Sequence, residues 1–258
     1  GLGWMRFRAD PPRARALAAA GFDIVSTANN HAYDFGAASI PITRRHLEEA
    51  GLTTLGSGAE PATPRILERN GVKVGFLGAT LVSNRPADPA ELSYVAPGKA
   101  AEVLGARVRE LRPRVDVVVV SLHWGTEYNQ SANAGQIAIA HALVDAGADL
   151  ILGHHPHVVQ GLERYQGAVI AYSLGNFVFD MADPVKRESM ILDVTFTASA
   201  GGRPTVAARA LPMLIDRDHV PAPPPAARAA AMRAAWAKLA RRFGTTGAEG
   251  EAYALVIP

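Results

Sequence analysis

Three stretches of the chain begin with polar residues, continue through unbroken aliphatic residues and end at or beside a histidine. They are GFDIVSTANNH (21–31), RVDVVVVSLHWG (114–125) and GADLILGHHPH (147–157). Continuous Val, Ile and Leu runs are typical of strands that are buried on both faces of a sheet. The pattern therefore predicts that strands over roughly 23–27, 115–122 and 148–152 are central neighbours in one buried sheet.

Between these stretches, apolar residues recur at helical spacing. The helical segments cover 11–21, 41–51, 100–112 and 134–147, and three of the four end at glycine, as helices often do. Because strand, helix and strand alternate, we expect an α/β layered domain. In such domains the loops that follow parallel strands gather at one edge of the sheet. All three histidine segments are predicted to lie at that edge.

The second half of the chain has a different pattern. Three apolar stretches, 168–180, 188–198 and 205–215, follow one another with only turn-like segments between them, which predicts antiparallel strands. After the proline-rich segment 221–227, a helical stripe is formed by Met232, Trp236, Leu239 and Phe243, and packing explains it better than a ligand.

These patterns predict a division of the chain into two parts. Residues 1–220 form the main domain. Residues 221–258 are a proline-rich linker, an amphipathic helix and a terminal strand that pack on the same domain.

Composition narrows the classes of function. With 258 residues, 48% of them apolar and 19% charged, the chain fits one sizeable globular domain. A net charge of +2 without a basic stripe argues against binding to nucleic acid. The chain has no cysteine, so a metal would need His, Asp, Glu or Asn ligands.

The sequence leaves the compartment open. No apolar run reaches the roughly 18 residues of a membrane span, and the first residues lack both an initiator Met and a signal sequence. We therefore expect the chain to begin within a longer gene.

The segment GHHPHVVQG holds three of the eight histidines. If the strand end is extended, His155 and His157 project to the same side, so both imidazoles can reach one metal ion. His154 alternates to the opposite face, where lining a pocket and capping a backbone group are both open roles.

The segment ANNHAYDFG directly follows a predicted strand. Asn30 can offer a carbonyl oxygen to a metal, and His31 can act as a general acid because histidine ionises near neutral pH. In a helical turn, Asp34 can hold one ring nitrogen of His31. The alternative is an Asn/Asp-rich turn that ends at Gly36.

The segment SLHWGTEY places His123 at a strand end, where it can be a third nitrogen ligand. Glu127 can accept a hydrogen bond from a ligand histidine, bind the ion or meet a cationic substrate group. Trp124 and Tyr128 can form a pocket wall, although aromatic residues at strand ends are more often core. The other histidines are expected to lie elsewhere: His46, His141 and His219.

Four motifs in this order, ANNHAYDFG, HWGTEY, GHHPHVVQG and YSLGNFVFD, resemble the CapA-type bacterial capsule synthesis proteins. This poly-gamma-glutamate capsule family belongs to the calcineurin-like metallophosphoesterase superfamily. The resemblance implies a four-layer αββα sandwich with a metal centre at the strand ends. It places Asn30, His123, His155 and His157 at the ligand positions of the superfamily and His31 at the position of its acid. Asp34 is the second catalytic candidate, and the candidate substrate-binding residues are Glu127, Trp124, Tyr128 and Asn176.

The chain departs from the family at its N-terminus. Relatives begin with a strand that ends in Gly-Asp and continue to an Asn-Leu-Glu segment, and neither motif precedes Phe7. We therefore expect that N-terminal strands of the sandwich are missing. The implied cofactor is a divalent metal, Mn, Zn or Fe, as one ion rather than two because the bridging carboxylate is absent.

Three functions are compatible with these residues and motifs. The first is a metal-dependent hydrolase linked to capsule or poly-gamma-glutamate synthesis, with a small-molecule, polyanionic or peptidic substrate. The second is a non-catalytic protein that binds or assembles the polymer. The third is a metal-independent isomerase or epimerase that uses His31 and Asp34. The resemblance also implies membrane-associated capsule machinery as a partner and a place at the cell envelope.

Overall fold

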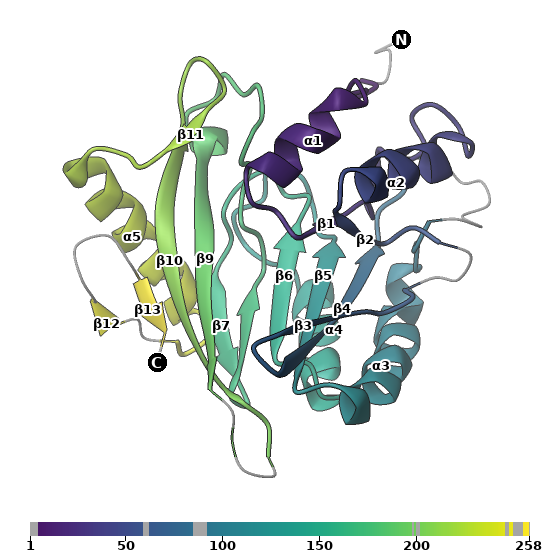
Figure 1. Cartoon of the computed structure of the whole chain (residues 1–258). Coiled ribbons are helices and arrows are strands. Elements are labelled where there is room, and N and C mark those ends of the chain that lie inside the picture. The colour runs from purple at the N-terminus through teal and green to yellow at the C-terminus, as the bar shows by residue number, and fades with distance from the viewer. Residues whose placement is uncertain are drawn as a thin grey trace.

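The computed structural model describes residues 5–58, 62–84, 92–197, 199, 202–245, 248–249 and 255–257 (Figure 1). The helices are α1 (Pro12–Ala19), α2 (Ser39–Glu49), α3 (Ala100–Leu111), α4 (Ala134–Asp145) and α5 (Ala226–Arg241). The strands are β1 (Ile24–Ser26), β2 (Thr53–Leu55), β3 (Arg65–Arg69), β4 (Val72–Thr80), β5 (Val117–His123), β6 (Leu150–His154), β7 (Leu162–Tyr165), β8 (Ala168–Ala171), β9 (Glu188–Thr197), β10 (Thr205–Ile215), β11 (Pro221–Ala222), β12 (Ala248–Glu249) and β13 (Leu255–Ile257). The four helices predicted in the first 150 residues are confirmed. Three of them end at glycines with positive φ, Gly21, Gly51 and Gly147.

A six-stranded sheet with the order β3-β4-β5-β6-β8-β7 forms the centre of the fold. Strands β4, β5, β6 and β8 run parallel, and the edge strands β3 and β7 are antiparallel to their neighbours. The prediction that the second and third aliphatic stretches are buried neighbours is confirmed, because β5 pairs with β6 and five of its first six residues are almost fully covered. Their carboxyl ends meet at one edge, where His123 is opposite His154.

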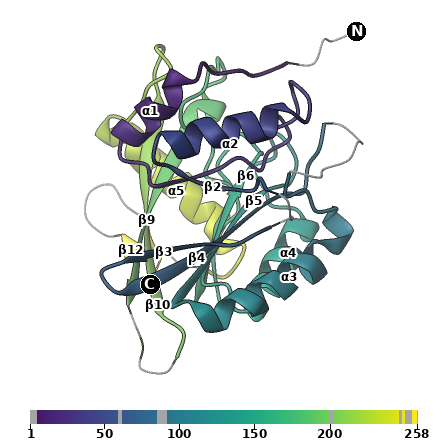
Figure 2. The same ribbon diagram turned by 45° about the vertical axis from the view of Figure 1, so that its right-hand side comes forward.

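The first aliphatic stretch does not join this sheet, so that part of the prediction was wrong. β1 pairs in parallel with β2 in a separate two-stranded sheet. The strand is only three residues long, and Val25 packs against Ala14, Leu47 and Leu52 beside α1 and α2. Its apolar side chains are thus covered by helices on one face and only partly buried overall. Figure 2 shows α1 and α2 side by side over this strand pair.

The second sheet is built mainly from β9 and β10, which pair antiparallel from Thr205 opposite Thr197 to Leu214 opposite Glu188. This confirms two of the three antiparallel strands predicted for the second half. The third, β8, is antiparallel to β7 but parallel to β6, because it extends the central sheet.

The two sheets pack face to face, and helices cover the outside. Val119 and Leu150 of the central sheet contact Val206 and Ala208 of β10. The opposite face of the central sheet packs against α3 and α4, which lie together on one side of the molecule in Figure 1, whereas α5 lies beyond β10. The predicted sandwich of helix, sheet, sheet and helix is therefore confirmed as the fold class.

The C-terminal segment contacts both sheets. Met232 and Trp236 of α5 are buried against residues of β7, β8, β9 and β10, so the helical stripe serves packing. β13 pairs with β10. The division at residue 220 stays a prediction. Among the described residues, no helix has the length and apolar character to cross a bilayer.

Candidate metal centre

Three loops at the carboxyl ends of strands form the site. β5 ends at His123 and continues to Glu127, β6 ends at His154 and continues to His157, and the loop after β1 carries Asn30 and His31. The parallel pairing of β5 and β6 brings the first two loops together, because parallel strands end at the same edge. A hydrogen bond between Asn30 and His123 joins the third loop to them.

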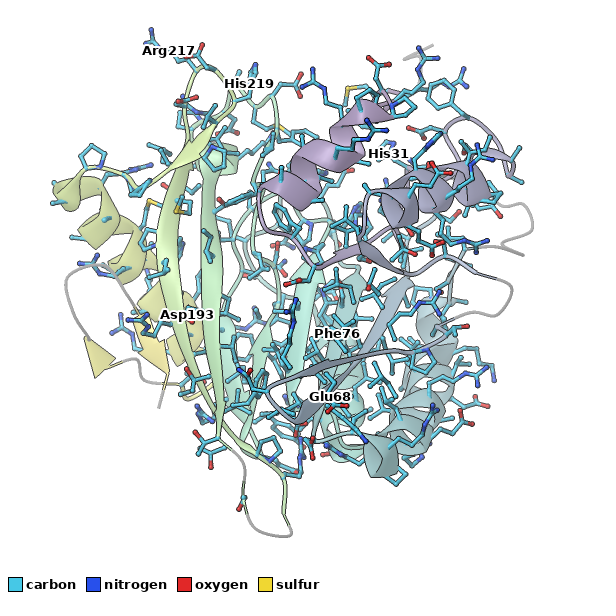
Figure 3. The ribbon with its side chains drawn as sticks, viewed as in Figure 1. His31, Glu68, Phe76, Asp193, Arg217 and His219 are labelled. Atoms are coloured by element: carbon cyan, nitrogen blue, oxygen red, sulfur yellow. The ribbon has the colours of Figure 1, made fainter. Side chains whose placement is uncertain are left out.

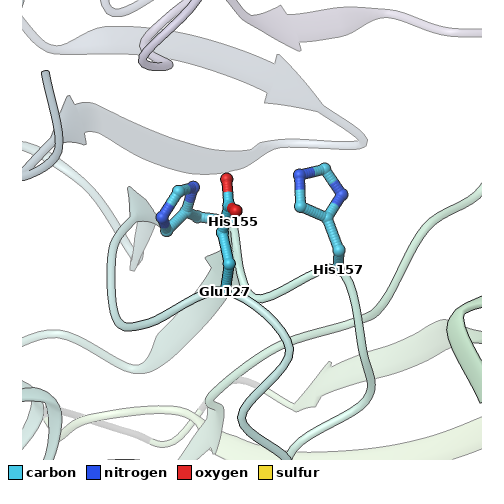
Figure 4. A group of neighbouring side chains, drawn as sticks. All are labelled: Glu127, His155 and His157. Carbon is cyan, nitrogen blue, oxygen red and sulfur yellow. The ribbon is translucent and has the colours of Figure 1, made fainter. Parts of the chain in front are cut away.

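Glu127, His155 and His157 form a compact group (Figure 4). One possible ligand atom from each residue lies within 4.8 Å of the other two. The glutamate is exposed, His157 is half-buried and His155 is buried, so the group is open to solvent on one side. One carboxylate and two imidazoles are a ligand set that divalent transition metals accept.

The backbone that presents the two histidines is not the extended strand end that the sequence suggested. β6 ends at His154, and both His155 (φ 96°) and His157 (φ 58°) adopt left-handed conformations on either side of Pro156. Such a conformation costs a non-glycine residue about 1–3 kcal/mol and clusters at functional sites. The two imidazoles therefore converge because of a strained loop and not because of strand alternation.

His155 has the features of a metal ligand. Its Nδ1 atom is buried and has no hydrogen-bond partner among the described residues. Burial lowers the pKa of His155, and Glu127 opposes that shift. A neutral imidazole with an unpaired buried nitrogen, beside a carboxylate, fits a divalent metal ion well.

His123 adjoins this group. Its ring centroid lies 4.8 Å from that of His155, and its Nε2 atom lies 2.8 Å from Oδ1 of Asn30. Burial, followed by the neighbouring histidines His155, His154, His157 and His31, lowers the pKa of His123 to about 2. The ring is thus neutral at physiological pH, which is the form that binds metals.

Asn84 orients the Asn30 amide. The Nδ2 group of Asn30 donates to Oδ1 of Asn84 at 3.0 Å, which leaves Oδ1 of Asn30 directed at His123. Asn84 was not among the predicted site residues. It lies 54 residues from Asn30 in the chain, and no motif in its sequence surroundings marks it.

His31 and Asp34 form the pair that the sequence suggested. Nδ1 of His31 lies 2.9 Å from Oδ2 and 3.2 Å from Oδ1 of Asp34, and the same Oδ2 accepts a hydrogen bond from the Phe7 backbone. The Phe7 ring stands edge-on to the imidazole, with centroids 4.6 Å apart. With Nδ1 held by the carboxylate, Nε2 is the ring nitrogen left for a substrate.

His31 lies near the histidine group, since its charge is among those that lower the pKa values of His123 and His155. Phe179 links the two parts of the site. Its ring is 5.9 Å from Phe7 and 5.2 Å from His157.

Two of the predicted substrate-binding residues, Trp124 and Tyr128, differ in their exposure to solvent. Trp124 is only 1% exposed and its indole donates to the Tyr172 carbonyl, so it is a core residue and we assign it no substrate contact. Tyr128 is 46% exposed beside His157. The ammonium group of Lys186, another residue that the sequence did not indicate, lies 3.7 Å from the centroid of the Tyr128 ring.

Asn176 contacts a histidine of the metal-ligand group. Its Oδ1 atom lies 2.7 Å from Nδ1 of His157, and its Nδ2 group donates to the carbonyls of His157 and Lys186. These contacts fix the imidazole orientation, as hydrogen bonds behind metal ligands do.

The remaining histidines lie outside the group. His154 ends β6, its pKa is lowered to about 4 by burial, and its carbonyl accepts from the Trp124 backbone. His46 pairs with Glu49, and His141 pairs with Glu163. His219 lies in the turn after β10 (Figure 3).

Comparisons with known proteins agree with one another. The sequence profile described as bacterial capsule synthesis protein PGA_cap matches residues 2–181. The chain is 36% identical over 198 residues to the PGA biosynthesis protein CapA of Bacillus subtilis, covering 70% of this chain and 49% of that protein. It is 37% identical over 186 residues to the capsule biosynthesis protein CapA of Bacillus anthracis, covering 69% and 45%. The chain thus spans about half the length of these curated relatives.

A more distant relative and a solved structure extend the comparison. A probable polyglutamine synthesis accessory protein of Mycobacterium tuberculosis is 30% identical over 236 residues, covering 82% of this chain and 60% of that protein. A Staphylococcus aureus crystal structure of a candidate 5′-nucleotidase has a TM-score of 0.52 at 18% identity, covering 76% of this chain and 38% of that chain. This last likeness is one of fold.

Proposed function

Because the chain belongs to the bacterial capsule synthesis protein PGA_cap family, we propose that it is a metal-dependent phosphoester hydrolase that serves capsule synthesis. The observation that carries the proposal is the convergence of Glu127, His155 and His157 within 4.8 Å of one another. The names of the relatives favour a role with an anionic capsule or glutamate polymer. The candidate 5′-nucleotidase of similar fold favours a phosphoester over an acyl substrate.

We assign Glu127, His155 and His157 as ligands of a divalent metal, with His123 and Asn30 at the same centre. Lewis-acid polarisation of the phosphoryl group and acidification of water are the chemistry that such an ion supplies. Asn176 holds His157, and Asn84 holds Asn30, so each of these ligands has a fixed orientation.

His31 is the general acid in this proposal. As water adds to phosphorus and the bond to the leaving oxygen breaks, His31, protonated on both ring nitrogens, donates its Nε2 proton to that oxygen and keeps its Nδ1 proton. Asp34 accepts a hydrogen bond from Nδ1 and so keeps the proton-bearing nitrogen directed at the substrate. The rings of Phe7 and Phe179 lie on this side of the site.

Two substrates with different leaving groups test the roles of the residues. Purified protein is loaded with Mn²⁺ or Zn²⁺, metal content is measured by mass spectrometry, and hydrolysis of hexyl phosphate is compared with that of 4-nitrophenyl phosphate. His31→Ala should keep its metal and lose about 10²- to 10⁴-fold of turnover on hexyl phosphate, whose alkoxide needs a proton. It should lose far less on 4-nitrophenyl phosphate, whose phenolate leaves without one. His155→Ala should lose metal and both activities together.

His141→Gln serves as the matched control, because this histidine pairs with Glu163 away from the site. It should keep metal and activity. Equal loss on both substrates in His31→Ala contradicts the assignment of the general acid. Isomerase or epimerase activity that survives exhaustive chelation and is lost in His31→Ala would indicate that metal-independent chemistry instead. Tight polymer binding without hydrolysis of any phosphoester would indicate a binding or assembly protein.

A further inference from the structure

A large cleft is lined by His31 but not by the metal-ligand group Glu127, His155 and His157. It has a volume of about 980 Å³ and is bounded by α1, α2, the loop after β1 and the segment Val178–Asp180. Phe7, which contacts His31, and Phe179, which contacts His157, both line the cleft. The cleft therefore adjoins the candidate metal centre through His31 and Phe179. Figure 3 shows His31 beside α1 and α2.

Large apolar side chains form much of the cleft lining, and several of these side chains are exposed to solvent. Five large apolar residues that are more than a third exposed line this one cleft: Phe7, Leu17, Phe35, Ile42 and Val178. Clustered exposed apolar residues of this kind mark binding surfaces, whereas isolated ones need no explanation.

Formal charge does not give the cleft a preference for ions of one sign. Its lining includes two arginines, Arg8 and Arg13, and two aspartates, Asp10 and Asp180. The guanidinium carbon of Arg8 lies 5.9 Å from the centroid of the Phe35 ring, so this cation is placed over an aromatic face. The apolar area, and not charge, is what this cleft offers a ligand.

The position of the cleft indicates which part of a substrate it would hold. The phosphoryl group must lie beside Glu127, His155 and His157, and the leaving oxygen must face Nε2 of His31. The group attached to that oxygen then extends past His31 into the cleft. We propose, on the basis of the hydrolase function, that the cleft is the leaving-group subsite and that it selects phosphoesters of apolar alcohols, either alkyl or aryl.

Binding of two phosphonates tests this inference without requiring turnover. Methylphosphonate and hexylphosphonate carry the same head group and are not hydrolysed. The difference between their affinities, measured by isothermal titration calorimetry of the metal-loaded protein, therefore reports the contribution of the alkyl chain. Each methylene that becomes buried strengthens binding about fourfold. Hexylphosphonate should therefore bind at least about tenfold more tightly than methylphosphonate if two or more methylenes enter the cleft.

Charged substitutions locate the subsite. Ile42→Glu on α2 and Leu17→Glu on α1 change side chains that are 47% and 38% exposed, so the fold tolerates them. Each should remove most of the hexyl preference and leave methylphosphonate affinity unchanged. Val103→Glu on α3 is the matched control, because Val103 is 37% exposed and lies away from the cleft. It should alter neither affinity.

The outcomes separate this inference from the proposed function. Equal affinity for the two phosphonates, or a hexyl preference that survives both Ile42→Glu and Leu17→Glu, overturns the subsite even if phosphoesters are hydrolysed. A hexyl preference that both substitutions abolish, in a protein that hydrolyses no phosphoester with any metal, keeps the apolar subsite and overturns the hydrolase.

Discussion

Acidification should destabilise the metal-free protein steeply, because two histidines at the strand ends are neutral in the fold. The pKa of His123 is lowered to about 2 and that of His154 to about 4, in both cases mainly by burial. In the unfolded chain both return to the usual histidine pKa near 6.5. Between about pH 4 and pH 6.5 the unfolded state therefore binds more protons than the folded state.

The sign of the effect follows from this difference. Stability rises with pH wherever the unfolded state holds more protons, so lowering the pH through this window favours unfolding. Each such histidine contributes about 2 kcal/mol of lost stability between pH 7 and pH 5, hence about 4 kcal/mol for the two. The pKa of His155 is also lowered, which adds to the loss. A domain has about 5–15 kcal/mol of stability in total, so this is a large fraction.

Urea unfolding in the presence of a chelator measures the effect. The free energy of unfolding is obtained at pH 7, 6 and 5 from fluorescence of the tryptophans, for the native sequence and for His154→Gln. The substitution should reduce the loss between pH 7 and pH 5 by about half, whatever it does to stability at a single pH. Equal stability at pH 5 and pH 7 would refute the buried, neutral state of these histidines.

Substitutions at three positions test individual contacts. His155→Gly removes a strained left-handed residue and its unpaired buried nitrogen. The melting temperature without metal, measured by calorimetry, should therefore stay within a few degrees of the native value. Metal binding, measured by metal titration, should be lost. Asn84→Ala should weaken metal binding about 10- to 100-fold by freeing the Asn30 amide, whereas Asn84→Asp keeps the accepting oxygen and should preserve it. Asp34→Asn should lower kcat about 10- to 100-fold at unchanged metal content by misaligning His31, and a loss of metal would contradict that positioning role.

The sequence predicted those parts of the fold that local chemistry determines. Residues 117–122 are almost all aliphatic, and a strand that is covered on both faces is the structure that buries such side chains. Gly21, Gly51 and Gly147 end their helices because glycine adopts positive φ at little cost. The sheet to which β1 belongs was not predictable in this way. A three-residue strand carries too little pattern to distinguish the central sheet from a separate pair.

The sequence indicated most of the residues of the candidate site, but it did not indicate the backbone geometry that brings them together. Histidine spacing indicated His155 and His157, but no local rule predicts left-handed conformations on both sides of Pro156. The partners that orient the ligands come from distant parts of the chain, as Asn84 does for Asn30. The sequence left two roles open for Trp124, because an aromatic residue beside a ligand histidine can face either the pocket or the core, and only packing decides which.

The most direct test of the central claim is a crystal structure of the protein grown with Mn²⁺, with diffraction data collected at the manganese absorption edge. An anomalous peak should lie among Glu127, His155 and His157, with carboxylate oxygen and imidazole nitrogen atoms about 2.0–2.3 Å from it. It should vanish in His155→Gly, which is expected to keep the fold. No peak at this position at millimolar Mn²⁺, or a peak at a different group of residues, would contradict the assignment of the metal centre and with it the proposed hydrolase.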